Sequence, residues 1–315
     1  MFEYPALSLV IPTWNRKKTL DKILFSLTKQ NFKRRFEIII CDSNSRDGTK
    51  ELIKKYISYP YFVIRHYNLE NNISVKRNFG LKFAQSDNII FIDDDCVPER
   101  SYLNKFYELL KNSDSNIVYC GLVKFPKKKL LQNFYKYRQS RHFSNTNNKD
   151  LDEGRIVTMN MGIKRNLIQK KQEYFDKNLG VLGKGLNGFE DYEFAFRLKK
   201  KQIKIVKCNC TIFHFDERNL KEHAKKFLIF GKYTIHKLEE INFEACKKNY
   251  YYKLKKNLII KFLTRNTILP KIMIFLSKLI INLDEKSYKL GYFNFKFVLL
   301  SYYVYGLSIK NNAKQ

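Results

Sequence analysis

Acidic residues are scarce in this sequence. Asp and Glu number 30 against 60 Lys and Arg, which leaves a net charge of +30 on 315 residues. A charge of this size favours an anionic partner, such as nucleic acid, an anionic membrane or a substrate that carries phosphate. Lys, Asn, Ile, Phe and Tyr are all used heavily, so the compositional bias of an AT-rich genome is an alternative source of the charge.

Cysteine is also rare, and long apolar runs are missing. The six cysteines are scattered without a CxxC pair, which argues against a disulfide scaffold and favours a reducing compartment. No apolar run reaches the ~20 residues of a membrane-spanning helix. The N-terminus has an early Glu3 and only a short apolar stretch, unlike a secretory signal. We therefore expect a cytoplasmic protein.

The chain does have enough apolar residues for a sizeable core, at 44% of the sequence. Its length suits one large α/β domain with an appendage, or two domains. Over the first 125 residues, runs typical of buried strands alternate with helical spacing of leucine and isoleucine. This alternation predicts βαβ units and a mostly parallel, right-handed sheet. The expected strands are residues 7–12, 36–42, 61–67 and 88–93.

Three polar clusters fall where expected strands end, and in parallel sheets ligands bind at that edge. The clusters are residues 13–15, 42–47 and 93–95. On an extended segment Asp93 and Asp95 would share one side. Two carboxylates can hold a divalent cation, and hard oxygen ligands favour Mg²⁺ or Mn²⁺. The alternative is a solvated turn with one helix N-cap.

Further along, residues 126–155 are basic and polar and are expected to form a mobile connection. Strand-like apolarity returns at 154–168. A helix is expected to start at Glu190, and a pair of strands should follow it before residue 217.

Six segments carry recognisable motifs in a fixed order. They are "LVIPTWNR" (9–16), "IICDSNSRDGT" (39–49), "ISVKRNFGL" (73–81), "FIDDDCVP" (91–98), "FEDYEFAFRL" (189–198) and "IFHFDE" (212–217). Together they resemble the family-2 inverting glycosyltransferases, whose fold is GT-A, and the fourth segment is that family's DxD motif. The second half resembles the galactosyltransferase-like part of bacterial chondroitin-type synthases. Two departures are "SNS" (43–45) in place of the usual "DGS", and Asn72 where a glycine often stands.

The resemblance implies a role for each matching residue. Arg77 would approach the diphosphate of a nucleotide sugar, although a salt bridge to Asp42 or Asp93 is an equal and compatible alternative. Divalent metal, Mn²⁺ or Mg²⁺, would be held by Asp93, Asp95 and His214, whereas a histidine buried in the core is the alternative for His214. The donor would contact Pro12, Thr13, Asn15, Asp42, Arg77, Asp93 and Asp94.

An inverting transfer also needs a carboxylate that removes a proton from the acceptor hydroxyl. Asp191 matches the family's base, and Glu190 would orient the acceptor. The alternative for Asp191 is an acid placed at a helix N-terminus, where the helix dipole favours negative charge.

These observations predict a GT-A catalytic domain over 1–235, with a nucleotide-sugar half (1–125) and an acceptor half (154–217). The basic, aromatic region 236–315 should be helical and peripheral to the inner face of the plasma membrane, or else a cap on the domain. The expected enzyme is a hexosyl- or N-acetylhexosaminyltransferase of surface polysaccharide or glycoconjugate synthesis. It would move a sugar, with a UDP-sugar favoured as donor, to a glycan or lipid-linked acceptor. A basic nucleic-acid-binding protein is the alternative, but no nucleic-acid motif is present.

Overall fold

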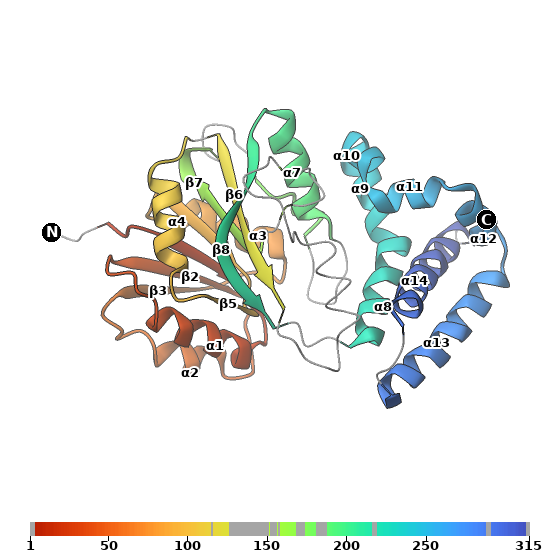
Figure 1. Cartoon of the computed structure of the whole chain (residues 1–315), viewed down its shortest axis with the longest axis horizontal. Helices are drawn as coiled ribbons and strands as arrows, with labels where there is room; N and C mark the ends of the chain where they lie inside the picture. Colours follow the sequence, from red (N-terminus) through yellow and green to blue (C-terminus); the bar gives the residue numbers. More distant parts are fainter. Residues whose placement is uncertain are drawn as a thin grey trace. The chain divides into compact units, whose positions relative to one another are not determined.

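The computed structural model describes residues 4–114, 116–125, 151, 156, 158–167, 174–180, 188–215, 219–287 and 291–312. They form two compact units (Figure 1). The first unit contains every strand of the described residues. The second contains residues 188–189 and the helices from Leu220 onward. The expected boundary at residue 235 lies within a run of helix, whereas the C-terminal segment of the second unit begins at residue 217. The expected mobile connection, 126–155, lies outside the described residues except for Leu151.

Four parallel strands form one half of an eight-stranded sheet, in the order β3-β2-β1-β4. The apolar runs of β1, β2 and β4 are buried on both faces, as expected for strands covered by helices on two sides, whereas β3 is largely half-buried. The mostly parallel sheet is therefore confirmed, and each predicted strand end is correct to within one residue. The elements are β1 (Ser8–Pro12), α1 (Lys17–Thr28), β2 (Phe36–Asp42), α2 (Thr49–Lys54), β3 (Phe62–Asn68), α3 (Ile73–Phe83) and β4 (Asn88–Ile92).

The other half of the sheet is mixed. Strand β7 (Asn160–Lys164) runs antiparallel to both β4 and β6 (Ile117–Lys124). Strand β8 (Lys204–His214) then pairs parallel to β6, and β5 (Cys96–Pro98) pairs antiparallel to β8. Helices α4 (Tyr102–Lys111) and α7 (Glu190–Lys200) belong to this half.

The expected strand pair after Glu190 is wrong, because β8 is a single strand of 11 residues. Asn209, a polar residue in its middle, is exposed on the strand and does not mark a turn. The ladder between β6 and β8 shifts register between Cys120 and Leu122, so that β8 continues without a break. This length carries His214 to the same end of the sheet as the residues that follow β4.

Helix α3 lies very close to β1. A Cβ on Gly80 would stand 2.2 Å from Cγ1 of Val10, so only glycine allows this approach. Val10 itself belongs to the core on one face of the sheet, while Leu9 and Ile11 belong to the core on the other face. The close approach fixes the position of Arg77, which lies one turn earlier on α3.

The second unit is helical, as expected for the C-terminal region. Its short helices begin at asparagines whose side chains accept hydrogen bonds from the first turn, at Asn219, Asn242, Asn249 and Asn257. Among the described residues no single helix is long and apolar enough to cross a membrane, while Leu258–Arg265 and Leu269–Leu283 pass that test only together, across a bend of 96°. The elements are α8 (Leu220–Ile229), η3 (Phe230–Thr234), α9 (Ile235–Ile241), α10 (Phe243–Lys248), α11 (Tyr250–Lys256), α12 (Leu258–Arg265), α13 (Leu269–Ser287) and α14 (Tyr292–Asn312).

Candidate active site

The three consecutive aspartates form a turn between β4 and β5. The backbone N–H of Cys96 donates to the carbonyl of Asp93 at 3.1 Å and closes the turn. The expectation that 93–95 continue as an extended segment is therefore wrong, and the alternation argument for a shared side does not apply. The reason is that the chain reverses here, because β5 must pair with the end of β8.

Each aspartate of the turn has its own partners, which explains how three adjacent carboxylates are tolerated. Asp93 accepts a hydrogen bond from Nη2 of Arg77 at 3.1 Å. Asp94 accepts from the Thr13 hydroxyl at 2.7 Å. Asp95 lies 2.8 Å from Nη1 of Arg16 and 3.2 Å from Nε2 of His214. The turn is thus tied at once to the loop after β1, to α3 and to β8.

The carboxyl group of Asp94 has a raised pKa. Burial raises the pKa of its carboxyl to about 7, although the Arg16 guanidinium opposes this shift and Asp95 reinforces it. Its oxygens face Thr13 and Arg16, at 2.7 and 3.9 Å. Asp94 and Thr13, both expected to contact the donor, therefore bind each other in the folded chain.

Arg77 joins the two halves of the site. Its Nη1 donates to Oε1 of Glu190 at 3.0 Å, while its Nη2 holds Asp93. The guanidinium is buried and lies over the ring of Phe175, 5.6 Å from the ring centroid. Burial would lower the pKa of Arg77, but Asp93, Glu190 and Asp191 together raise it. The salt bridge to Asp93 was one of the alternatives expected from the sequence, whereas the bridge to Glu190 was not expected.

Glu190 and Asp191 open helix α7. Glu190 is buried against Arg77, so in this structure it binds the arginine. Asp191 is half-buried, and its Oδ1 accepts from the backbone N–H of Tyr192 at 2.8 Å. Asp191 is therefore close enough to Arg77 to help raise the pKa of the guanidinium, and it is more exposed to solvent than Glu190.

The loops after β1 and β2 are bound to each other. Asn15, in the left-handed region at φ 50°, accepts from the backbone N–H of Arg46 at 2.8 Å, and its own N–H donates to the hydroxyl of Ser45 at 2.7 Å. Asp47 accepts from the backbone N–H of Lys17 at 2.7 Å, at the start of α1. Pro12, the last residue of β1, is buried opposite Cys41. The two loops consequently form one rigid edge.

Asp42 organises the second of these loops. It accepts from the backbone N–H of Ser43 at 2.7 Å, from the Ser45 hydroxyl at 2.5 Å, and it pairs with Nε2 of His66 at 3.3 Å. Burial alone would raise the pKa of Asp42, but the bonds from His66 and the two serines lower it below its usual value. A stable carboxylate therefore lies at this edge of the sheet.

Lys76 is a buried lysine that the sequence analysis did not single out. Its Nζ donates to the carbonyl of Thr13 at 2.8 Å. Burial lowers its pKa to about 8, while the nearby Asp94 and Asp42 favour the ammonium. Lys76 and Arg77 thus bring two cationic side chains from α3 to the same edge.

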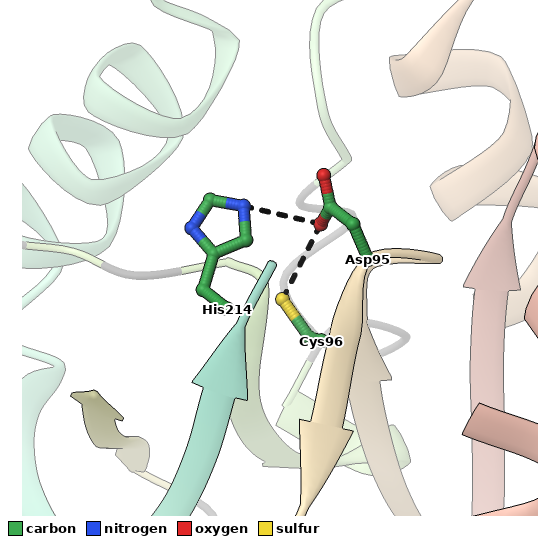
Figure 2. A group of neighbouring side chains, drawn as sticks. All are labelled: Asp95, Cys96 and His214. Carbon is green, nitrogen blue, oxygen red and sulfur yellow. Dashed lines mark hydrogen bonds and ion pairs between the residues drawn. The ribbon is translucent and has the colours of Figure 1, made fainter. Parts of the chain in front are cut away.

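Asp95, Cys96 and His214 form a cluster with the spacing of metal ligands (Figure 2). Their donor atoms all lie within 4.8 Å of one another. Nε2 of His214 and Sγ of Cys96 both face Oδ1 of Asp95, at 3.2 and 3.5 Å. An octahedral cation with bonds of about 2.1 Å holds adjacent ligands about 3 Å apart, so the carboxylate–imidazole pair fits a divalent cation.

Cys96 fits such a cation less well. Burial, together with the charges of Asp95 and Asp93, raises the pKa of its thiol well above the usual value, so the sulfur keeps its proton and donates to Asp95. Hard cations also prefer oxygen and nitrogen to sulfur. Asp95 and His214 are therefore the pair suited to Mg²⁺ or Mn²⁺. Asp93, expected as a third ligand, lies against Arg77 outside this cluster.

The missed residues divide into those that had a signal in the sequence and those that did not. Arg16 closes the first motif and Lys76 immediately precedes Arg77, so motif position could have pointed to both. Cys96 follows Asp95 within the fourth motif segment, so motif position could have pointed to it as well. His66 had no such signal, because its role depends on the pairing of β2 with β3.

Known proteins resemble this chain in sequence and in fold. The family model described as "Glycosyl transferase family 2" matches residues 8–170. An uncharacterised glycosyltransferase of Haemophilus influenzae is 29% identical over 199 residues, which are 61% of this chain and 61% of that protein. A chondroitin synthase of Pasteurella multocida is 30% identical over 123 residues, 38% of this chain and 12% of that protein. The matched segment thus covers less than two thirds of either relative.

Among solved structures, Staphylococcus aureus TarS 1–349 in complex with UDP-GlcNAc aligns with a TM-score of 0.54 at 15% identity, covering 98% of this chain and 91% of that one. This likeness concerns the fold and confirms the expected GT-A class. The fold, together with a candidate site at the ends of its strands, indicates a GT-A glycosyltransferase. The chain belongs to glycosyl transferase family 2, as its motifs predicted.

Proposed function

We propose that this protein transfers a sugar from a nucleoside diphosphate sugar to an acceptor hydroxyl, with inversion at the anomeric carbon. The observation that carries the proposal is the buried Arg77, which binds Asp93 from the first half of the site and Glu190 from the second. Both expected sets of residues, donor-binding and catalytic, thereby meet at one edge of the sheet.

The donor side of the site offers recognition for a nucleotide and charge for its phosphates. The carboxylate of Asp42 is held in place by His66 and the serine loop, so it can accept from a base without first being ordered. Lys76 and Arg77 supply positive charge close to the Thr13 carbonyl and the aspartate turn. UDP is the favoured nucleotide, because the similar fold of TarS was solved with UDP-GlcNAc.

The acceptor side requires a base, and we assign that role to Asp191. Its carboxylate is half-buried at the start of α7, more open than Glu190, and can reach a hydroxyl that enters from solvent. Glu190 is a positioning residue, because it holds Arg77 and through it Asp93. A divalent cation bound by Asp95 and His214 would neutralise the charge of the leaving diphosphate.

The product class we propose is a surface polysaccharide or glycoconjugate, made by a hexosyl- or N-acetylhexosaminyltransferase acting on a glycan or lipid-linked acceptor. Support comes from the relatives' names, which include chondroitin synthases and, in Staphylococcus aureus, poly(ribitol-phosphate) β-N-acetylglucosaminyltransferases. The alternative of a nucleic-acid-binding protein has no support among these relatives.

The test of the proposal is Asp191→Asn, a nearly isosteric change. Loss of a general base slows transfer by ~10²–10⁴-fold, whereas donor and Mn²⁺ affinity, measured by calorimetry, should stay near the native values. Glu240→Gln, at an exposed acid of α9, is the matched control and should transfer normally. Native turnover in Asp191→Asn would exclude Asp191 as the base. Joint loss of donor binding and turnover would assign it a donor-side role instead.

The metal assignment needs its own measurement. Asp95→Asn removes a charge from the carboxylate–imidazole pair but keeps its size, so Mn²⁺ affinity should fall at least tenfold. Asp93→Asn should change Mn²⁺ affinity much less, since Asp93 faces Arg77. If both variants bind Mn²⁺ equally and as well as the native chain, the cation is held elsewhere.

A further inference from the structure

Helix α13 is apolar on the face that it shows to solvent as well as on the face that it buries. Its buried side, on which Ile281 lies beside the small Ser277, packs on α14 and is otherwise apolar. A helix in a water-exposed position normally carries charged or polar residues on its outer face. Here that face carries Ile272, Phe275, Leu276, Leu279 and Leu283, all exposed.

These exposed residues form one stripe. At about 100° per residue, they fall within a sector of roughly a quarter to a third of the helix circumference. Helix α12, which meets α13 across a bend of 96°, has its own exposed apolar residues, Leu258, Ile259 and Phe262, and Ile268 lies in the turn between the two helices. We name these nine residues the apolar ridge; Phe275 is 61% exposed and Leu258 80%. Burying such side chains on this scale calls for a partner.

Positive charge borders the apolar ridge. Lys271 and Lys278 lie on α13 about 100° from the centre of the stripe, where long side chains can extend along an apolar surface to polar headgroups. Lys261 and Arg265 are likewise exposed on α12. From residue 245 to residue 283 the sequence contains no Asp or Glu at all. The partner must therefore be both apolar and anionic.

We infer that the apolar ridge and its flanking lysines dock this protein on an anionic lipid surface. An interfacial helix combines an apolar face, which enters the boundary between headgroups and acyl chains, with basic residues at its margins. A second copy of this chain fits less well, since residues 245–283 would meet their own basic side chains and offer no Asp or Glu, and the two acids of α13, Asp284 and Glu285, lie beyond the last residue of the ridge. The inference is independent of the proposed sugar transfer, because it rests on the helical unit alone.

Flotation of the full chain with lipid vesicles tests the inference. Vesicles of phosphatidylcholine with about a third phosphatidylglycerol should bind the protein, and binding should weaken with added salt. Lys271→Gln with Lys278→Gln should weaken binding roughly fivefold per lysine. Phe275→Glu with Leu279→Glu should weaken it at least tenfold. The matched control is Ile57→Glu, at an exposed apolar residue of the first unit.

A second measurement does not depend on a disruptive variant. All six native cysteines are buried, so a single introduced surface cysteine can be labelled selectively. An environment-sensitive fluorophore on Phe275→Cys should brighten and shift to the blue when anionic vesicles are added. The same label on Ile57→Cys, at a residue 56% exposed in the native chain, should not respond.

Three results would overturn the inference. The first is native chain that binds neither anionic nor neutral vesicles. The second is binding that Phe275→Glu with Leu279→Glu leaves unchanged, or a label at position 275 that reports only water. The third is a native oligomer, measured by light scattering, that this double variant converts to monomer without any effect of lipid; the ridge would then be a contact between copies.

Discussion

Replacing Lys76 with methionine should change how the stability of the first unit depends on pH. In the folded chain burial lowers the pKa of Lys76 to about 8 from 10.5, even though Asp94 and Asp42 favour its charged form. The folded state therefore loses the proton at a lower pH than the unfolded state does. Between about pH 8 and 10.5 the unfolded chain binds more protons, so the free energy of unfolding rises with pH across that window.

The size of the effect follows from the two pKa values. One pKa unit corresponds to about 1.4 kcal/mol, so the cost of the buried ammonium is roughly 3 kcal/mol, present in full below pH 8 and absent above pH 10.5. Lys76→Met has no such proton to lose. The stability of the variant relative to the native chain should consequently fall by roughly 3 kcal/mol between pH 7 and pH 10.5.

Denaturant unfolding at a series of pH values measures this difference. Trp14, the single tryptophan of the chain, lies in the first unit and reports its unfolding. Lys82→Met, at an exposed lysine of the same helix, serves as the control and should differ from the native chain by a constant amount. A Lys76→Met curve that also runs parallel to the native curve from pH 7 to 10.5 would refute the reasoning, since Lys76 would then titrate as a solvated lysine.

Three further substitutions test other parts of the structure. Asn160→Leu removes the amide that binds the Tyr102 hydroxyl and the carbonyls of β6 and β8, and urea unfolding should show a loss of about 3 kcal/mol or more. Arg77→Lys keeps the charge but cannot hold two carboxylates in a fixed fork, so thermal unfolding should register a loss of about 1.5–3 kcal/mol. Asn257→Ala removes the N-cap of α12, and amide hydrogen exchange there should quicken by the equivalent of about 1 kcal/mol. An unchanged stability in any of the three would contradict the corresponding contact.

The sequence predicted the parallel strands well because their physical signal is local. A strand buried on both faces needs a continuous apolar run, as in 36–42, and nothing distant alters that requirement. Strand β8 was expected to be a pair of strands, and only its pairing with β6 and β5 shows that it continues without a break past the exposed Asn209. Sequence position alone does not reveal which neighbour a polar residue faces.

The candidate site was predicted in composition and in part in its pairings, since Arg77 with Asp93 stood as an alternative and Asp95 with His214 belonged to the expected metal ligands. Asp93 and Asp95 were expected to act together, yet the turn sends Asp93 to Arg77 and Asp95 to His214. These partners come from α3 and β8, more than 15 and 110 residues away in the chain, so neither spacing nor propensity fixes them. The roles of Asp191 and the cation pair stay predictions until they are measured.

The close approach of α3 to β1 at Gly80 has a consequence for which sequence changes this chain can accept. A methyl group at position 80 would meet Val10 at 2.2 Å, and the helix would have to move outward to admit it. Arg77 lies on the same side of that helix one turn away, so its guanidinium would move with it. Position 80 makes no hydrogen bond to the site, but a survey of tolerated substitutions would group it with the residues that do. The absence of a side chain at Gly80 is thus a requirement for the position of Arg77, and through it for the site at the edge of the sheet.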